Sequence, residues 1–190
     1  MRIFGEDKGN MFILVTGGAA SGKSAFAESV VSNSGYSRKL YIATMRPFDD
    51  ECIGKIEKHH KMREHRGFFT SEVYGLIFEN YGADTSVISK SAVIVECMSN
   101  YLNNIMFRVK DKPYAEIENA VLEDMFQLVK LCPYLTIVTN EIFSNGSAYS
   151  AEITEYIRLL GKLNRILAKL ADEVYEVVCG IPVCLKKGEH

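Results

Sequence analysis

No apolar run in this sequence approaches the roughly 20 residues that a helix needs to span a bilayer. The first residues also lack the charged and then apolar pattern of a signal peptide. We therefore expect no membrane span and a cytoplasmic protein. The net charge is only −2, so electrostatics gives no argument for a nucleic-acid partner.

Closely spaced cysteine pairs of the C-x-x-C type are also missing. An odd number of scattered cysteines with apolar neighbours argues against a disulfide framework and against a cysteine metal site. We expect reduced thiols that pack as small apolar groups, with only Cys184 exposed enough to react. The five are Cys52, Cys97, Cys132, Cys179 and Cys184.

Internal repeats and low-complexity tracts are absent as well. The chain is 47% hydrophobic and 24% charged, which is ordinary for a globular protein and excludes a disordered or fibrous one. Its 190 residues suit one α/β domain, so residues 1–190 are predicted to form a single nucleotide-binding domain. Residues 1–10 are expected to form either an N-terminal extension or a short antiparallel edge strand at residues 2–4.

What the sequence does contain is a phosphate-binding loop. The apolar run 11–15 leads into residues 17–24, GGAASGKS, which fit G-x-x-x-x-G-K-[ST] at every fixed position. Glycines let successive backbone N–H groups turn toward phosphate oxygens, and the following helix adds its positive end. Lys23 is expected to reach the β and γ phosphates and Ser24 to bind Mg²⁺. A plain strand-to-helix connection is the alternative, and the order strand, loop, helix disfavours it. The predicted nucleotide-binding residues of the loop are Gly17, Gly18, Ala19, Ala20, Ser21, Gly22, Lys23 and Ser24.

Apolar periodicity predicts strands and helices that alternate along the chain. Strands are expected at 11–15, 39–44, 68–72, 91–97, 135–139, 174–179 and 183–185, and helices at 23–31, from 49 onward, and at 73–81, 98–109, 114–132 and 150–170. This alternation predicts a mostly parallel sheet with right-handed crossovers, and with the loop it indicates a P-loop NTPase-like (RecA-like) three-layer sandwich. Phe26, Val30 and Val31 are expected on the buried face of the first helix.

Polar side chains at the ends of several predicted strands are expected to meet at one edge of this sheet, outside the carboxyl ends of the strands. They are the phosphate loop, Thr44, Glu96 and the pair Asn140 and Glu141. Glu96 stands where a carboxylate could hold Mg²⁺ opposite Ser24. It could also cap a helix, but a buried unpaired acid is costly, which favours the metal role. For Asn140 and Glu141 both readings stay open.

Two adjacent histidines, His59 and His60, lie on a predicted helix among basic residues. A solvated basic face is one interpretation of such a run. The other is catalytic, because neighbouring cations favour the neutral imidazole, which can attack phosphorus in a nearby triphosphate. The residues alone leave both open. The basic neighbours are Lys55, Lys58, Lys61 and Arg63.

The order of these motifs resembles the bifunctional adenosylcobinamide kinase/adenosylcobinamide-phosphate guanylyltransferase family of cobalamin biosynthesis. The similarity runs from residue 11 to residue 183, with Asn104 eight residues after Glu96. The series YIAT…DDE…I-x-x-H-x-x-x-R is far more specific than the phosphate loop. The matching stretches are GGAASGKS, YIATMRPFDDE, KIEKHHKMR, VIVEC, VTNE, GKLN and ADEVYEVVCGIPV.

The resemblance implies a two-step enzyme with GTP and ATP as substrates, Mg²⁺ as cofactor, a corrinoid acceptor and a homotrimeric assembly. A kinase step phosphorylates adenosylcobinamide. A histidine then takes GMP from GTP and passes it to adenosylcobinamide phosphate, giving adenosylcobinamide-GDP.

The resemblance also assigns residues. His59 matches the nucleophile, with His60 next in line. Lys61 and Arg63 would hold phosphates, and Glu72 would contact the guanine nucleotide. The remaining nucleotide-binding positions are Ile42, Ala43, Thr44 and Met62.

The chain departs from the family pattern after VTNE. Residues 143–149 replace a glycine and Val-Pro loop, and Tyr156-Ile157-Arg158 replace an F-R-D triplet, which removes a cation at Ile157. One extra residue also lies between Arg63 and Thr70, and a phenylalanine replaces the usual tryptophan nearby. Two alternatives therefore stay open: a P-loop kinase or nucleotidyltransferase with another acceptor, and a non-catalytic nucleotide-binding homologue.

Overall fold

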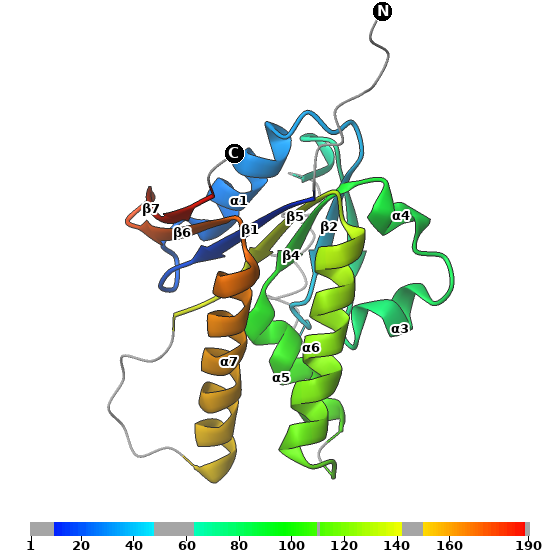
Figure 1. The fold of residues 1–190 in the computed structure, drawn as a ribbon, viewed down its shortest axis with the longest axis vertical. Coiled ribbons are helices and arrows are strands. Elements are labelled where there is room, and N and C mark those ends of the chain that lie inside the picture. Colours follow the sequence, from blue (N-terminus) through cyan, green and yellow to red (C-terminus); the bar gives the residue numbers. More distant parts are fainter. Residues whose placement is uncertain (1–9, 48–62, 110, 142–149, 189–190) are drawn as a thin grey trace, which may run out of the picture.

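The computed structural model describes residues 10–47, 63–109, 111–141 and 150–188, and its strands form one seven-stranded sheet (Figure 1). The strand order is β3-β2-β4-β5-β1-β6-β7. Every pairing is parallel except that of β6 with β7, so the predicted mostly parallel sheet is confirmed. The strands are β1 (Met11–Thr16), β2 (Lys39–Ala43), β3 (Phe68–Glu72), β4 (Ala92–Glu96), β5 (Tyr134–Val138), β6 (Glu173–Val178) and β7 (Ile181–Lys187).

The described helices cover both faces of the sheet. Helix α1 packs on one face, and the other helices contribute to the larger apolar core on the opposite face, as Figure 1 shows for α5, α6 and α7. The helices are α1 (Lys23–Ser32), α3 (Ile77–Tyr81), α4 (Ser86–Ser89), α5 (Met98–Arg108), α6 (Tyr114–Leu131) and α7 (Ala151–Leu170). The expected three-layer α/β fold is confirmed. None of these helices combines the length and the apolar composition that crossing a bilayer requires.

Strand β1 shows why the central strands are apolar along their whole length. Phe12 and Leu14 belong to the larger core, whereas Ile13 and Val15 belong to the core beneath α1. Successive side chains of a strand point to opposite faces, and here helices cover both faces. The continuous apolar run therefore fits an interior strand, which lies between β5 and β6, and the phosphate loop follows at its carboxyl end.

The predicted helix 73–81 is wrong at its start, because α3 begins only at Ile77. The Asp124 carboxylate of α6 accepts the backbone N–H groups of Ile77 at 2.9 Å and Phe78 at 3.0 Å. These are two of the donors that the first turn of a helix leaves without a partner inside the helix. A residue distant in sequence thus caps this helix start.

The buried face of α1 is wider than predicted. Val31 is buried as expected, and Phe26 and Val30 are half-buried and pack against the core beneath α1. Lys23, Ala27 and Glu28 are buried as well. Lys23, Ala27 and Val31 are spaced by four and form one stripe along the helix. The stripe begins at the phosphate-loop lysine, so the packing of α1 fixes where Lys23 lies.

The cysteine prediction needs one correction. Cys97 and Cys132 are buried, as expected of thiols that pack as apolar groups, and Cys184 is exposed. Cys179 is exposed as well, because it lies on the turn between β6 and β7. Cys52 and the possible edge strand at residues 2–4 lie outside the described residues.

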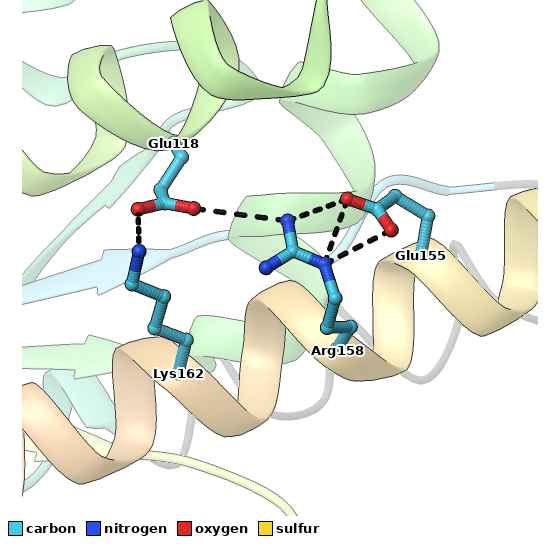
Figure 2. Close-up of polar contacts among 4 residues, drawn as sticks. All are labelled: Glu118, Glu155, Arg158 and Lys162. Carbon is cyan, nitrogen blue, oxygen red and sulfur yellow. Dashed lines mark hydrogen bonds and ion pairs between the residues drawn. The ribbon is translucent and has the colours of Figure 1, made fainter.

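Ion pairs join α6 to α7 (Figure 2). Glu118 of α6 contacts the Lys162 amine through one carboxylate oxygen and the Arg158 guanidinium at 3.8 Å through the other. Arg158 also pairs with Glu155 on its own helix. The Glu118 side chain is only 11% exposed, whereas Arg158 and Lys162 are about half-exposed. The cluster therefore fixes the spacing of two helices on the large-core face.

Replacing Glu118 by Gln is expected to lower the free energy of unfolding by about 1 kcal/mol, measured by urea denaturation. The loss stays modest because the two cations can regain water. Glu116→Gln, an exposed site on the same helix, is the matched control and should change stability by less than about 0.5 kcal/mol. Equal effects of the two substitutions would contradict a structural role for the Glu118 pairs.

Candidate functional site

The loop between β1 and α1 has the backbone shape that its glycines predict. Gly17 has φ +148° and Gly22 has φ +97°, and α1 begins directly at Lys23. A Cβ atom on Gly17 would lie 2.5 Å from the carbonyl oxygen of Val177 in β6, closer than such atoms can approach. The loop is therefore seated against β6, and only glycine fits at that contact.

Two other segments donate hydrogen bonds to carbonyl groups of this loop. The N–H of Gly180, in the β6–β7 turn, donates to Ser21 O at 2.8 Å. The N–H of Glu141, after β5, donates to Gly17 O at 3.2 Å. Sequence reasoning did not identify Gly180, and the only signal was its place in a Cys-Gly-Ile-Pro turn between two apolar runs.

Lys23 is buried to 7% exposure in this loop, and its amine donates to Gly18 O at 2.6 Å. Burial lowers the pKa of Lys23 below its usual value of 10.5, against the opposing influence of Cys97 and Glu96. A desolvated ammonium group at the start of a helix strongly favours an anion as partner. The loop therefore has the charge and the geometry to hold a polyphosphate.

Glu96, the last residue of β4, meets the loop at Ser24. The Ser24 hydroxyl donates to Oε1 of Glu96, and the Tyr41 hydroxyl donates to Oε2. In the sheet, β5 alone separates β4 from β1, so these ends lie at one edge. The sequence prediction that Ser24 and Glu96 come together agrees with this contact.

The Ser24 and Glu96 pair fits Mg²⁺ by its donor chemistry. Hydroxyl and carboxylate oxygens are the ligands that Mg²⁺ takes, and it is commonly held by one or two carboxylates together with substrate phosphates. Among the described residues no group of three or more His, Cys, Asp or Glu could form a cage for a metal. One carboxylate beside a phosphate-binding loop is the arrangement expected for a Mg²⁺ ion that takes most of its other ligands from substrate phosphates and water.

A hydrogen-bond network joins the ends of β2, β4 and β5. The Thr44 hydroxyl bonds both backbone groups of Cys97, at 2.7 Å and 2.9 Å, and Asn104 donates to Thr44 O at 2.7 Å. Asn140 donates to the Ser99 hydroxyl at 2.6 Å. Thr44 and Asn104 are buried, so the network makes this edge rigid.

Arg63 lies against α1 and β2. Its Nε is 3.7 Å from Glu28 Oε1, and its guanidinium carbon is 3.7 Å from the centre of the Tyr41 ring. Arg66 also pairs with Glu28. Sequence reasoning did not identify Glu28 or Tyr41, although Glu28 is one helical turn beyond Ser24.

The other predicted site residues lie at different distances from Glu96 in the sheet. Ile42 is buried in the large core, Ala43 pairs with Glu96 in the sheet register, and Glu72 ends β3 with the Tyr74 hydroxyl 2.6 Å from its carboxylate. Glu72 therefore lies two strands from Glu96, across β2. The predicted residues His59, His60, Lys61 and Met62 lie outside the described residues.

Comparisons with known proteins cover nearly the whole chain. Residues 13–185 match the family described as cobinamide kinase / cobinamide phosphate guanyltransferase. The protein named bifunctional adenosylcobalamin biosynthesis protein CobU of Escherichia coli (strain K12) is 34% identical over 93% of this chain and 100% of its own length. Its namesake from Salmonella typhimurium is 33% identical over the same shares. The relative named CobP from Pseudomonas aeruginosa is 26% identical over 91% of this chain and 96% of its own.

Among solved structures, the flagellar accessory protein FlaH of Methanocaldococcus jannaschii matches with a TM-score of 0.53. The match covers 94% of this chain and 79% of FlaH at 11% sequence identity. At that identity the similarity concerns the fold alone, which is that of an α/β P-loop protein.

Proposed function

This chain belongs to the cobinamide kinase / cobinamide phosphate guanyltransferase family, and on that basis we propose that it phosphorylates adenosylcobinamide and then transfers GMP to the product. The observation that carries the proposal is the direct contact of Ser24 with Glu96 beside the desolvated Lys23. Ser24 and Glu96 supply oxygen ligands for a cation, and Lys23 supplies the positive charge that binds phosphate. Both proposed steps require these groups.

In the kinase step, the loop amides and Lys23 bind the phosphates of ATP or GTP. The substrate hydroxyl attacks the γ phosphorus, the bond to the β–γ bridging oxygen breaks, and the nucleoside diphosphate leaves. Lys23 lowers the barrier by stabilising the charge that spreads over the transferring oxygens. Ser24 and Glu96 would hold Mg²⁺, which neutralises phosphate charge when it is bound.

In the second step, His59 attacks the α phosphorus of GTP and pyrophosphate leaves, which gives a histidine–GMP phosphoramidate. A phosphate oxygen of adenosylcobinamide phosphate then attacks the same phosphorus and the P–N bond breaks. The product is adenosylcobinamide-GDP, and the histidine is regenerated. The proposed phosphate contacts are Lys61 and Arg63, and the proposed guanine-nucleotide contacts are residues 42–44, 60, 62 and 72.

The proposal predicts a covalent label. Wild-type protein incubated with α-³²P-labelled GTP and Mg²⁺ should retain acid-labile radioactivity, because a P–N bond hydrolyses in acid. His59→Ala should retain none. His60→Ala is the matched control and should still be labelled. An unlabelled wild type, or a label that survives in His59→Ala, would refute His59 as the nucleophile.

Two further measurements separate the alternatives. Binding of cobinamide, followed by the absorbance of the corrin ring, would argue against an unrelated acceptor. Release of pyrophosphate from GTP in the presence of cobinamide phosphate would eliminate a non-catalytic homologue. Failure of both would refute the proposed function and leave the two alternatives, an enzyme with another acceptor and a non-catalytic nucleotide-binding homologue.

We also propose a cytoplasmic homotrimer. Apolar side chains on the edge hairpin support an assembly, because Val178, Ile181, Val183 and Leu185 are each at least 45% exposed. Sedimentation equilibrium would show a mass three times that of the 21.3 kDa chain.

A further inference from the structure

Tyr41 contacts two groups that the proposed mechanism uses. Its hydroxyl donates to Oε2 of Glu96, and its ring carries the Arg63 guanidinium. Arg63 in turn approaches Glu28 of α1, the helix that follows the phosphate loop. None of the roles assigned above uses Tyr41, although it is 1% exposed and among the largest fully buried side chains.

The sheet register explains how Tyr41 reaches Glu96. Tyr41 of β2 lies opposite Ile94 of β4, and Ala43 lies opposite Glu96. Residues two apart on a strand share a face, so Tyr41 and Glu96 are diagonal neighbours on the α1 side of the sheet. A long phenol side chain spans that diagonal, which a shorter residue would not.

The ring of Tyr41 has little freedom to turn. Phe68 of β3 packs against it edge to face, with the ring centres 6.1 Å apart and an interplanar angle of 88°. The Arg63 guanidinium lies 3.7 Å from the ring centre. The hydroxyl is therefore directed at Glu96 by packing before any ligand binds.

We propose that Tyr41 is a positioning residue that holds the Glu96 carboxylate in the orientation needed to bind Mg²⁺ with Ser24. One oxygen of Glu96 is occupied by the Tyr41 hydroxyl, so the other is presented to Ser24 and to the cation. Groups that orient a metal ligand in this way commonly change metal affinity without touching the metal. The inference rests on the proposed nucleotide and Mg²⁺ site.

The test measures the binding of a fluorescent GTP analogue, with no turnover required. Tyr41→Phe keeps the ring and its contacts with Phe68 and the Arg63 guanidinium, and it removes only the hydroxyl. The Mg²⁺ concentration for half-maximal enhancement of analogue binding should rise about tenfold. Affinity without Mg²⁺ should stay within about twofold, because the loop amides and Lys23 are unchanged. Tyr134→Phe, at the amino end of β5, is the control and should match the wild type.

A second variant tests whether Tyr41 acts through Glu96. In a Glu96→Ala background, Tyr41→Phe should have no further effect on the Mg²⁺ dependence. An equal loss of affinity with and without Mg²⁺, or an additive effect in the Glu96→Ala background, would overturn the inference and indicate a purely structural role. A wild type that binds no GTP analogue would instead refute the proposed function.

Discussion

Lys23→Met is expected to lower kcat/KM for the nucleotide by about 10²- to 10³-fold in both half-reactions. The substitution keeps the length of the buried stem and removes the ammonium group. Lys23 is 7% exposed beside the loop carbonyl of Gly18, so water cannot replace the lost charge next to a bound phosphate. Steady-state assays of phosphorylation and of pyrophosphate release would measure the loss.

The control for this prediction is Lys130→Met, which removes an exposed lysine at the end of α6. It should leave both activities within about twofold of the wild type. Thermal unfolding should show that Lys23→Met remains folded, since burying an uncharged side chain is not costly. A Lys23→Met protein with wild-type kcat/KM would remove the phosphate loop from the mechanism.

The same lysine predicts how activity depends on pH. Because burial lowers the pKa of Lys23 below 10.5, the ammonium form is lost at a lower pH than for an exposed lysine. The value of kcat/KM should therefore fall as the pH rises through that lowered pKa. The alkaline limb should be absent from the residual activity of Lys23→Met.

Asp124→Ala is expected to lower the free energy of unfolding by about 4 kcal/mol. Its carboxylate accepts two backbone N–H groups at the start of α3 and the hydroxyl of the buried Tyr101. Removing it leaves two buried donors and one part-buried donor without their acceptor, and it opens a cavity. Urea unfolding measures the loss, and Glu123→Ala, at the exposed neighbouring position, should cost less than about 0.5 kcal/mol.

Asp124→Asn removes the titratable charge together with one of the two accepting oxygens, because an amide nitrogen cannot accept from the N–H and O–H donors at this site. Burial raises the pKa of Asp124 despite the three hydrogen bonds that favour its ionised form. A carboxyl whose folded-state pKa is raised stabilises the protein at low pH and loses that contribution as the pH rises through the raised value. The advantage of the wild type over Asp124→Asn should therefore shrink as the pH rises above 4. An advantage that grows with pH would contradict the assignment.

The sequence alone predicted the alternation of strands and helices along the chain, the mostly parallel sheet, and the placing of Ser24 and Glu96 at one edge of it. These follow from local patterns, because an apolar run marks a doubly covered strand and a motif of eight residues fixes one loop. Long-range side-chain partners were not predictable. The start of α3 depends on Asp124, and the orientation of Glu96 depends on Tyr41, which reads in sequence as one more apolar residue of a strand.

The histidine hypothesis stays a prediction of the resemblance. Residues 59–62 lie outside the described part of the chain, so the labelling of His59 is the measurement that decides it. The phosphate-binding role of the neighbouring Arg63 also stays a prediction. Its place in the motif suggests a phosphate contact, and its described partners are Glu28 and the Tyr41 ring.

The hydrogen bond from Gly180 to Ser21 has a consequence for biosynthesis. The phosphate loop is translated before β2, β3, β4 and β5, yet the Gly180 amide that donates to it and the Val177 carbonyl that approaches Gly17 are translated after all of them. A nascent chain that contains only β1 to β5 therefore lacks both of these contacts. The loop should reach its final shape only after β6 and the β6–β7 turn have been synthesised.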